Sequence, residues 1–348
     1  MSILFNKTVL SCIFVTMLSA CGGGGGGGGG SGSPANTPAA SSSSAAAVTD
    51  ITASNQNQVA NTGITSVNAA LSIAGGARSP SSGSVSTLAL DASPSLQHSV
   101  AEIIDARIRS LVMREGSVFA VAAITSSSTT ACTGGGSYVG TEVYASSSTD
   151  TVGDTYTVVY TNCIESGLTL NGTVKLELRA FNANRTSFSI RVAYTSLRAA
   201  SGTTSMVYNG TYDLSTLYAT GSTTYGLTDG NISASFVSSG YTGTLGLSGM
   251  ATTSVVPTSG NITNNPVKLG LTATIAGTSI GMQIEAVAPV VTTSSGTYVS
   301  GKIKITGRGS ILYVTFLGSG SVKVDLDANG DGTIDSTKTT TITALAAS

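Results

Sequence analysis

The sequence predicts a mainly β protein, an antiparallel many-stranded sandwich or barrel preceded by one or two N-terminal helices. Beyond residue 117, apolar and polar residues alternate with a period of two, which is typical of half-buried strands. Turn-forming residues recur about every 8–12 residues and separate these segments. At that spacing, roughly twelve to sixteen strands fit into the chain. No proline occurs between Pro94 and Pro257, which suits strands that need every backbone donor.

The clearest pair of strands is LNGTVKLELRAF followed by TSFSIRVAYT. In the first segment, apolar side chains alternate with Lys175, Glu177 and Arg179, and Asn182-Ala183-Asn184-Arg185 predicts a hairpin turn between the two segments. The same alternation is compatible with a transmembrane barrel. Against that class, the C-terminal ALAAS lacks a terminal aromatic residue, and the charged face would have to line a lumen.

Two helices are predicted before the strands. Residues 51–74 carry apolar residues at spacings that fit one helical face, and Gly75-Gly76 ends this helix. The second helix has Ser99 as its N-cap and Gly116 at its end. Its apolar stripe consists of Val100, Ile103, Ile104, Ile108, Leu111 and Val112, and charged residues occupy its other faces.

The N-terminal residues 1–20 have the features of an export signal. Lys7 precedes an apolar run that is too short to span a bilayer, and small residues follow this run. The ending Leu18-Ser19-Ala20-Cys21 resembles the bacterial lipobox. That resemblance implies lipidation of the Cys21 thiol, cleavage before this residue and acylation of the new amino terminus. The alternative is an ordinary signal peptide in which the cysteine stands by chance.

The resemblance to lipoproteins also bears on location. In that class an aspartate after the lipidated cysteine retains the product at the inner membrane, so Gly22 favours the outer membrane, facing the periplasm or the cell surface. Nine glycines and then SGSPANTPAASSSSAAA follow Cys21 and predict a flexible leash. This leash resembles those of Gram-negative surface lipoproteins of the transferrin-binding and factor-H-binding types, a likeness that covers the leash alone.

These segments give the predicted organisation of the chain. It consists of a signal peptide at 1–20, the lipidated cysteine and leash at 21–49, a helical or linker segment at 50–116 and an antiparallel β domain at 117–348.

The composition bounds the partners of the protein. Only 9% of residues are charged, and removal of Lys7 with the signal changes the net charge from −1 to −2. Because no basic surplus is available to neutralise phosphates, we expect no nucleic-acid partner. The expected partners are the membrane, through the N-terminal lipid, and a protein or glycan ligand, for which tyrosines spread through the strands would supply contact area.

The four cysteines separate into three roles. Cys12 lies in the signal and Cys21 takes the lipid, which leaves Cys132 and Cys163 as an even pair in an oxidising compartment. A disulfide between them would close a loop of roughly thirty residues and stabilise the fold by about 3 kcal/mol. Two buried free thiols are the alternative.

Catalytic motifs are sparse. The sole histidine is His98, and the GTSIG at 277–281 matches a nucleophile elbow but has no histidine after it. Neither a zinc-type cluster nor a phosphate loop occurs. We therefore predict no enzymatic activity. Paired carboxylates of a glycosidase would have to come from residues that no local feature distinguishes, such as Glu142, Glu165, Glu177 and Glu285.

One segment, VDLDANGDGTIDS, resembles the calcium-binding loop of EF-hands without the flanking helices. Oxygen-bearing side chains at alternate positions suit a hard cation, although Lys338 stands where a bidentate glutamate normally completes the shell. The alternative is an ordinary hairpin turn, because Asn-Gly and Asp-Gly are strong turn dipeptides. The candidate calcium ligands are Asp327, Asn329, Asp331, Thr333 and Asp335, with Asp325 as a further one.

Taken together, these features predict a lipid-anchored envelope or cell-surface module that is rich in β-structure and has a binding or structural role. The alternatives are a carbohydrate-active envelope hydrolase and an accessory subunit of an outer-membrane complex. An exposed apolar patch would favour the first role, a cleft with two carboxylates the second and an unpaired strand edge the third.

Overall fold

Several predicted features lie in segments that the structure does not describe. The signal peptide, Cys21, the leash and the helix beginning at Ser99 lie outside the residues that the computed structural model describes. Those described residues are 49–73, 124–144, 151–165, 167–184, 186–238, 241–275 and 278–347.

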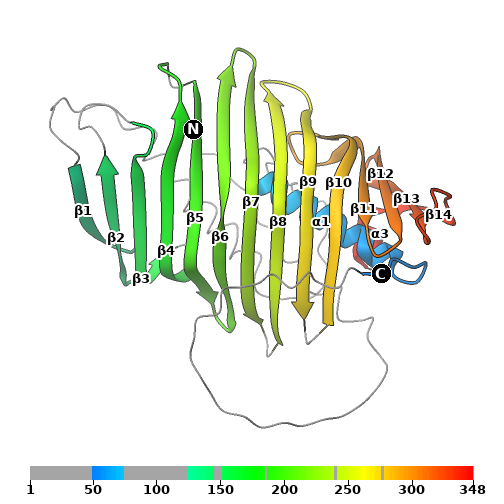
Figure 1. The fold of residues 1–348 in the computed structure, drawn as a ribbon, viewed down its shortest axis with the longest axis horizontal. Helices are drawn as coiled ribbons and strands as arrows, with labels where there is room; N and C mark the ends of the chain where they lie inside the picture. Colours follow the sequence, from blue (N-terminus) through cyan, green and yellow to red (C-terminus); the bar gives the residue numbers. More distant parts are fainter. Residues whose placement is uncertain are drawn as a thin grey trace, which may run out of the picture.

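The chain forms one sheet of fourteen antiparallel strands in which the spatial order equals the chain order (Figure 1). The mainly β, antiparallel, many-stranded prediction is confirmed, and the strands form a single sheet whose two ends are β1 and β14. The strands are β1 Ile124–Ala131, β2 Ser137–Tyr144, β3 Thr155–Glu165, β4 Leu168–Phe181, β5 Ser187–Ser201, β6 Thr204–Ala219, β7 Ser222–Ser238, β8 Tyr241–Pro257, β9 Ile262–Ile275, β10 Thr278–Thr292, β11 Tyr298–Thr306, β12 Ile311–Gly318, β13 Ser321–Asp327 and β14 Ser336–Thr341.

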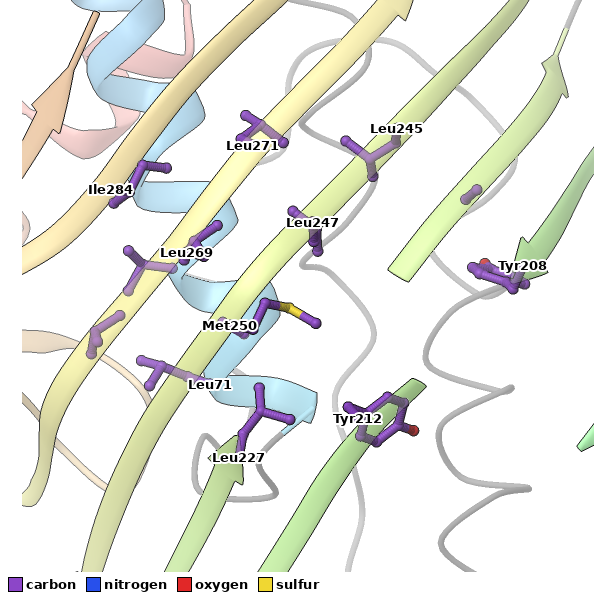
Figure 2. Packing of buried hydrophobic residues seen from close by; sticks show 14 of the residues in the cluster. Leu71, Tyr208, Tyr212, Leu227, Leu245, Leu247, Met250, Leu269, Leu271 and Ile284 are labelled. Atoms are coloured by element: carbon purple, nitrogen blue, oxygen red, sulfur yellow. The ribbon is translucent and has the colours of Figure 1, made fainter. Parts of the chain in front are cut away.

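One face of the sheet is the core, and helix α1, Gln56–Ile73, packs on it. The helix contacts β8 and β9 and also β12 and β13, so the later strands curl around it. Figure 2 shows Leu71 of α1 near Leu247, Met250 and Leu269 of the strands, and all four side chains are buried. Burying an apolar side chain of this size stabilises the fold by about 1.5–3 kcal/mol.

The core face also holds aromatic residues on β5 and β6. The Tyr194 and Tyr212 hydroxyls are joined by a hydrogen bond of 2.7 Å, and the Tyr208 ring lies 6.2 Å from that of Tyr194. Burial raises the pKa of Tyr194 to about 12. The expectation that the tyrosines offer contact area to a ligand is wrong for these three, because they belong to the core.

Helix α1 begins later than predicted. Residues 51–74 were expected to be helical, but the helix starts at Gln56. Before it, the Thr49 N–H donates to the Gly281 carbonyl of β10 (2.9 Å), and the Ile51 N–H donates to Ser310 Oγ (2.9 Å). Ile51 is buried although it is not helical, because an extended segment carries it against the β11–β12 turn. Ile51 was assigned to the helix because its spacing from Val59 fits one helical face.

The chain ends with a short helix that was not predicted. Strand β14, which is rich in threonine, ends at Thr341. The Thr341 side chain accepts a hydrogen bond from the Ala344 N–H and caps α3, Ile342–Ala346. Leu345 of α3 is buried, and α3 contacts α1. Within the described residues, neither helix has both the length and the apolar character needed to cross a membrane.

A line of β-bulges crosses the sheet. Each pairing from β3–β4 to β10–β11 has an interrupted register, whereas β1–β2 and β2–β3 pair without interruption. We call this line the bulge seam, and Asn162, Ser196, Asp229 and Gly249, all with positive φ, mark it on β3, β5, β7 and β8. A bulge bends its strand and increases the local twist, so the seam gives the sheet its curvature.

Asparagine side chains satisfy the backbone of the seam. At three of its residues the N–H group points at a neighbouring strand and donates to an asparagine side chain there instead of to a ladder carbonyl. These hydrogen bonds run from Asn162 to Asn171 Oδ1 (2.8 Å), from Ser196 to Asn209 Oδ1 (2.8 Å) and from Gly249 to Asn231 Oδ1 (3.1 Å).

Glycines leave space where carbonyl groups of the bulges approach a neighbouring strand closely. A Cβ atom on Gly172 would overlap the Ser196 carbonyl oxygen, and one on Gly210 would overlap that of Asn231. Both glycines also have positive φ, a region that other residues adopt at a cost. Each Asn-Gly pair therefore serves the bulges on both sides of its strand. Asn171 accepts from Asn162 of β3 while Gly172 leaves space for the Ser196 carbonyl of β5. Asn209 likewise accepts from Ser196 while Gly210 leaves space for the Asn231 carbonyl of β7.

We predict that Gly210→Ala destabilises the fold by about 2–4 kcal/mol, because it adds a backbone clash to the cost of positive φ. Gly221→Ala is the control: Gly221 also has positive φ, but its added Cβ would meet no atom within 4 Å. The control should therefore lose only about 1–2 kcal/mol. Urea unfolding measures both losses, and equal losses in the two variants would contradict the close approach.

Candidate functional site

The first corner of the sheet, where β1, β2 and β3 meet, is held by a disulfide. Cys132 directly follows β1 and Cys163 lies in β3, with their Cα atoms 5.4 Å apart and a sequence separation of 31. The predicted Cys132–Cys163 bond is confirmed. It ties together two strands that flank β2 and are not hydrogen-bonded neighbours of each other.

Backbone contacts reinforce this corner. The Gly134 N–H donates to the Ile164 carbonyl and the Ile164 N–H donates to the Gly135 carbonyl, both at 2.9 Å. A Cβ on Gly136 would overlap the Asn162 carbonyl oxygen, so the β1–β2 turn sits directly on the first residue of the bulge seam. The β1–β2 hairpin is thus fixed to the sheet by a covalent bond, by hydrogen bonds and by close packing.

Strand β1, with the sequence ITSSSTTA, is an edge of the sheet. All eight of its residues pair with β2 without a register shift. Residues 125–131 are exposed, and among the described residues no hydrogen bond joins the backbone of β1 to any strand other than β2. The strand has no charged residue, no proline and no bulge, which are the usual devices that protect a free edge from pairing.

The other edge of the sheet is different. Strand β14 has six residues and carries Lys338, an exposed side chain of the type that protects an edge. Helix α3 follows it immediately.

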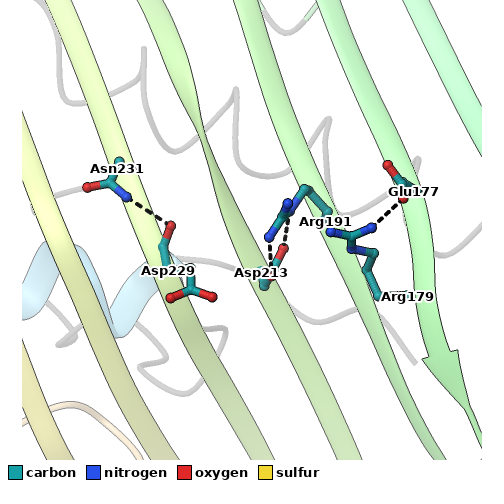
Figure 3. Close-up of polar contacts among 6 residues, drawn as sticks. All are labelled: Glu177, Arg179, Arg191, Asp213, Asp229 and Asn231. Atoms are coloured by element: carbon teal, nitrogen blue, oxygen red, sulfur yellow. Dashed lines mark hydrogen bonds and ion pairs between the residues drawn. The ribbon is translucent and has the colours of Figure 1, made fainter.

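The open face of the sheet, opposite to the core, carries charged pairs, one between two strands and one within a strand (Figure 3). Arg191 of β5 binds Asp213 of β6 in a bidentate geometry, with both N–O distances at 2.7 Å. The hydrogen bond to Asp213 is the main cause that raises the pKa of Arg191, and the charges of Glu177 and Asp229 add to it. Glu177 in turn binds Arg179 at 2.6 Å. Pairs this exposed add little stability, and the Arg191–Asp213 pair, which joins two strands, favours their register.

A shallow groove of about 430 Å³ lies on the same open face, across β6 to β9. Val207, Ser235, Thr244 and Thr274 form one cross-strand row in it, because each is the register partner of the next. Val237 is 44% exposed beside this row. The groove is lined by Ser205, Val207, Ser235, Phe236, Val237, Thr242, Gly243, Thr244 and Thr274, none of which is titratable.

The predicted calcium loop connects β13 and β14 as a hairpin turn. Asp327 is buried, and its two carboxylate oxygens accept hydrogen bonds from the N–H groups of Gly330 (2.6 Å), Asp331 (3.2 Å) and Gly332 (2.9 Å). Asp335 accepts from the Ala328 N–H at 2.7 Å. The loop therefore uses its acidic side chains to satisfy its own backbone.

The remaining candidate ligands are also bonded within the protein. Asp331 accepts from the Thr333 N–H at 2.7 Å, which lowers its pKa, and the Asn329 amide donates to it at 3.1 Å. Asp325 accepts from Thr337 Oγ1 at 2.7 Å and pairs with Lys323.

The carboxylates of this loop do not converge on one point. Within the described ranges, one group of three or more His, Cys, Asp or Glu ligand atoms lies within 4.8 Å, namely Cys132, Cys163 and Glu165. Both of its sulfurs are committed to the disulfide.

The other carboxylates named from the sequence lie on separate strands. Glu177 pairs with Arg179, Glu285 pairs with Lys304 at 3.1 Å, and Glu142 lies on β2. Ser279 of the GTSIG sequence lies in β10, next to the β9–β10 turn, and not at a strand-to-helix elbow. His98 is outside the described residues.

Comparison of the chain with protein-family models, with characterised proteins and with solved structures finds no match. Function is therefore inferred from the residues of this chain alone.

We predict that replacing both Cys132 and Cys163 by serine lowers the free energy of unfolding by about 3 kcal/mol, because the unfolded chain regains the freedom of the closed loop. Chemical denaturation of the exported protein measures the loss. In the wild type, alkylation after denaturation without reductant should label neither cysteine. Two labelled thiols would contradict the disulfide.

The calcium site stays a prediction. With a dissociation constant of about 0.5 mM, typical of weak extracellular sites, 5 mM calcium would stabilise the protein by about 1.4 kcal/mol. Thermal melting should then rise in the wild type and in the control Asp229→Asn, but not in Asp331→Asn. An unchanged melting temperature in all three proteins would leave only the hairpin turn.

Proposed function

We propose that this protein is a lipid-anchored module of the outer membrane that faces the periplasm or the cell surface and binds an uncharged part of a protein or glycan. The anchor is supported by the lipobox-like Leu18–Cys21 and by the leash that follows. The binding role is supported by one observation above all: the open face of the sheet carries a groove without titratable side chains.

The lining of the groove suits binding better than catalysis. Val207 and Val237 offer apolar area, and the serines and threonines offer hydroxyl groups that both donate and accept hydrogen bonds. General acid–base chemistry needs a titratable group within hydrogen-bond reach of the substrate, and the lining has none. A charged ligand would have no partner there, so the chemistry favours a neutral one.

A second candidate function is an accessory subunit of an outer-membrane complex. The free edge of β1 favours it, because an extended segment of another chain adds to such an edge by backbone hydrogen bonds.

The experiment uses the full chain expressed in a Gram-negative host. We expect Cys21→Ala to move the protein from the membrane fraction to a soluble or unprocessed pool, because the lipid is lost. Membrane retention equal to that of the wild type after a salt wash would contradict the anchor.

The groove is tested by measuring how tightly the detergent-purified protein binds outer-membrane vesicles from the same host. Val237→Asp places a charge in the groove and should weaken vesicle binding at least tenfold. Val287→Asp is the matched control, because Val287 is 49% exposed on β10 outside the groove. Equal binding by the two variants would contradict a binding role for the groove.

A further inference from the structure

The edge of β1 has the properties of a strand edge that can pair with a further strand. Its exposed residues are small and uncharged, and its register with β2 is unbroken over the whole strand. Strand edges with these properties act as templates for another strand. The disulfide at Cys132 and the contacts of the β1–β2 turn with β3 fix the edge in place, so little conformational entropy is lost when a partner binds.

The direction of the free amides follows from the turn. The Cys132 N–H donates to the Gly136 carbonyl at 3.1 Å, so it faces β2. Because N–H groups alternate in direction along a strand, those of Ser128 and Thr130 also face β2, whereas those of Ser127 and Thr129 face outward. The outward groups carry no partner among the described residues.

We infer that β1 pairs with β1 of a second copy of this chain, in antiparallel orientation about a two-fold axis, and extends the sheet across both copies. Antiparallel pairing is somewhat more stable per residue than parallel pairing. In a two-fold contact the same patch meets itself, so charges of one sign on the patch are brought close to like charges of the second copy. β1 contains none, whereas Lys338 would bring a charge to any contact made by β14.

The alternation of the amides also fixes the register. Residues with outward N–H groups must face each other, so the axis passes through a residue and not between two residues. An axis at Ser128 aligns the exposed residues 125–131 with their own copy. Ser127 then faces Thr129 of the second copy, and hydroxyl side chains meet hydroxyl side chains, a favourable cross-strand combination. This contact uses neither the groove nor the lipid anchor, so its test is independent of the first proposed function. It occupies the edge that the second candidate function would use.

The test is the mass of the detergent-solubilised full chain by light scattering during gel filtration, with the micelle subtracted. The wild type should have twice the mass of one chain. Ser127→Lys combined with Thr129→Lys should have the mass of one chain, with a dimer dissociation constant at least tenfold higher, because lysines of the two copies would face each other. Ser127→Pro should act in the same way, since it removes an outward N–H and leaves the hairpin bonds to β2.

The control carries two lysines at exposed positions away from β1, Ser300→Lys and Thr339→Lys, and should remain dimeric. A monomeric wild type would overturn the inference. So would a dimer that survives both β1 variants, or larger assemblies that the Thr339→Lys control abolishes, since these would indicate head-to-tail pairing of β1 with β14. Melting curves must show that each variant is folded.

A cross-link gives an independent readout. Ser128 lies on the inferred axis in a pair without mutual hydrogen bonds, where Cα atoms are about 4.5 Å apart and within disulfide range. Ser128→Cys should therefore form a covalent dimer in the exported full chain, which reductant splits. Thr339→Cys on β14 should not. No dimer from Ser128→Cys, or equal yields from both variants, would overturn the inference.

Discussion

The fold depends on the bulge seam, because a sheet this wide can bury only one face and must curl to do so. Its strands β4 to β10 run for 14–17 residues, far longer than the average strand of about 5–6. At Asn162, Ser196 and Gly249 of the seam, the backbone N–H leaves the strand ladder and donates to an asparagine side chain. Gly172 and Gly210 leave room for the carbonyl groups of Ser196 and Asn231 that approach them. The later strands can then close around α1 without leaving backbone groups unsatisfied.

The seam also explains why the first corner differs from the rest of the sheet. It begins at Asn162, where Gly136 and the disulfide fix the β1–β2 hairpin, and the pairings before it have no bulge. β1 therefore pairs with β2 without a bulge, and among the described residues its other edge has no neighbouring strand. The open face carries a groove lined mainly by serine, threonine and valine, together with a few paired charges. Both features suit contact with other molecules.

Alternation with a period of two correctly predicted a mainly β fold, because one-sided burial imposes that pattern on strands such as β4, β5 and β12. The disulfide was also predictable, since the prediction that assigns Cys12 to a signal and Cys21 to a lipid leaves Cys132 and Cys163 as a pair. The seam was not. Asn-Gly usually indicates a hairpin turn, yet Asn171-Gly172 and Asn209-Gly210 lie inside strands, and only the register of the neighbouring strand shows the bulge that they serve. In the loop that resembles an EF-hand, Asp327 accepts hydrogen bonds from three backbone N–H groups, which the residue types alone did not indicate. Calcium binding by this loop stays a prediction.

Amide hydrogen exchange at the seam tests this account most directly. Asn162, Ser196 and Gly249 are exposed, so solvent would exchange their amide hydrogens rapidly unless the asparagine side chains hold them. We predict that all three amides are protected in the folded protein, and that Asn209→Ala removes the protection of Ser196 while that of Asn162 persists. Rapid exchange at all three positions in the wild type would contradict a sheet held in its curvature by the seam.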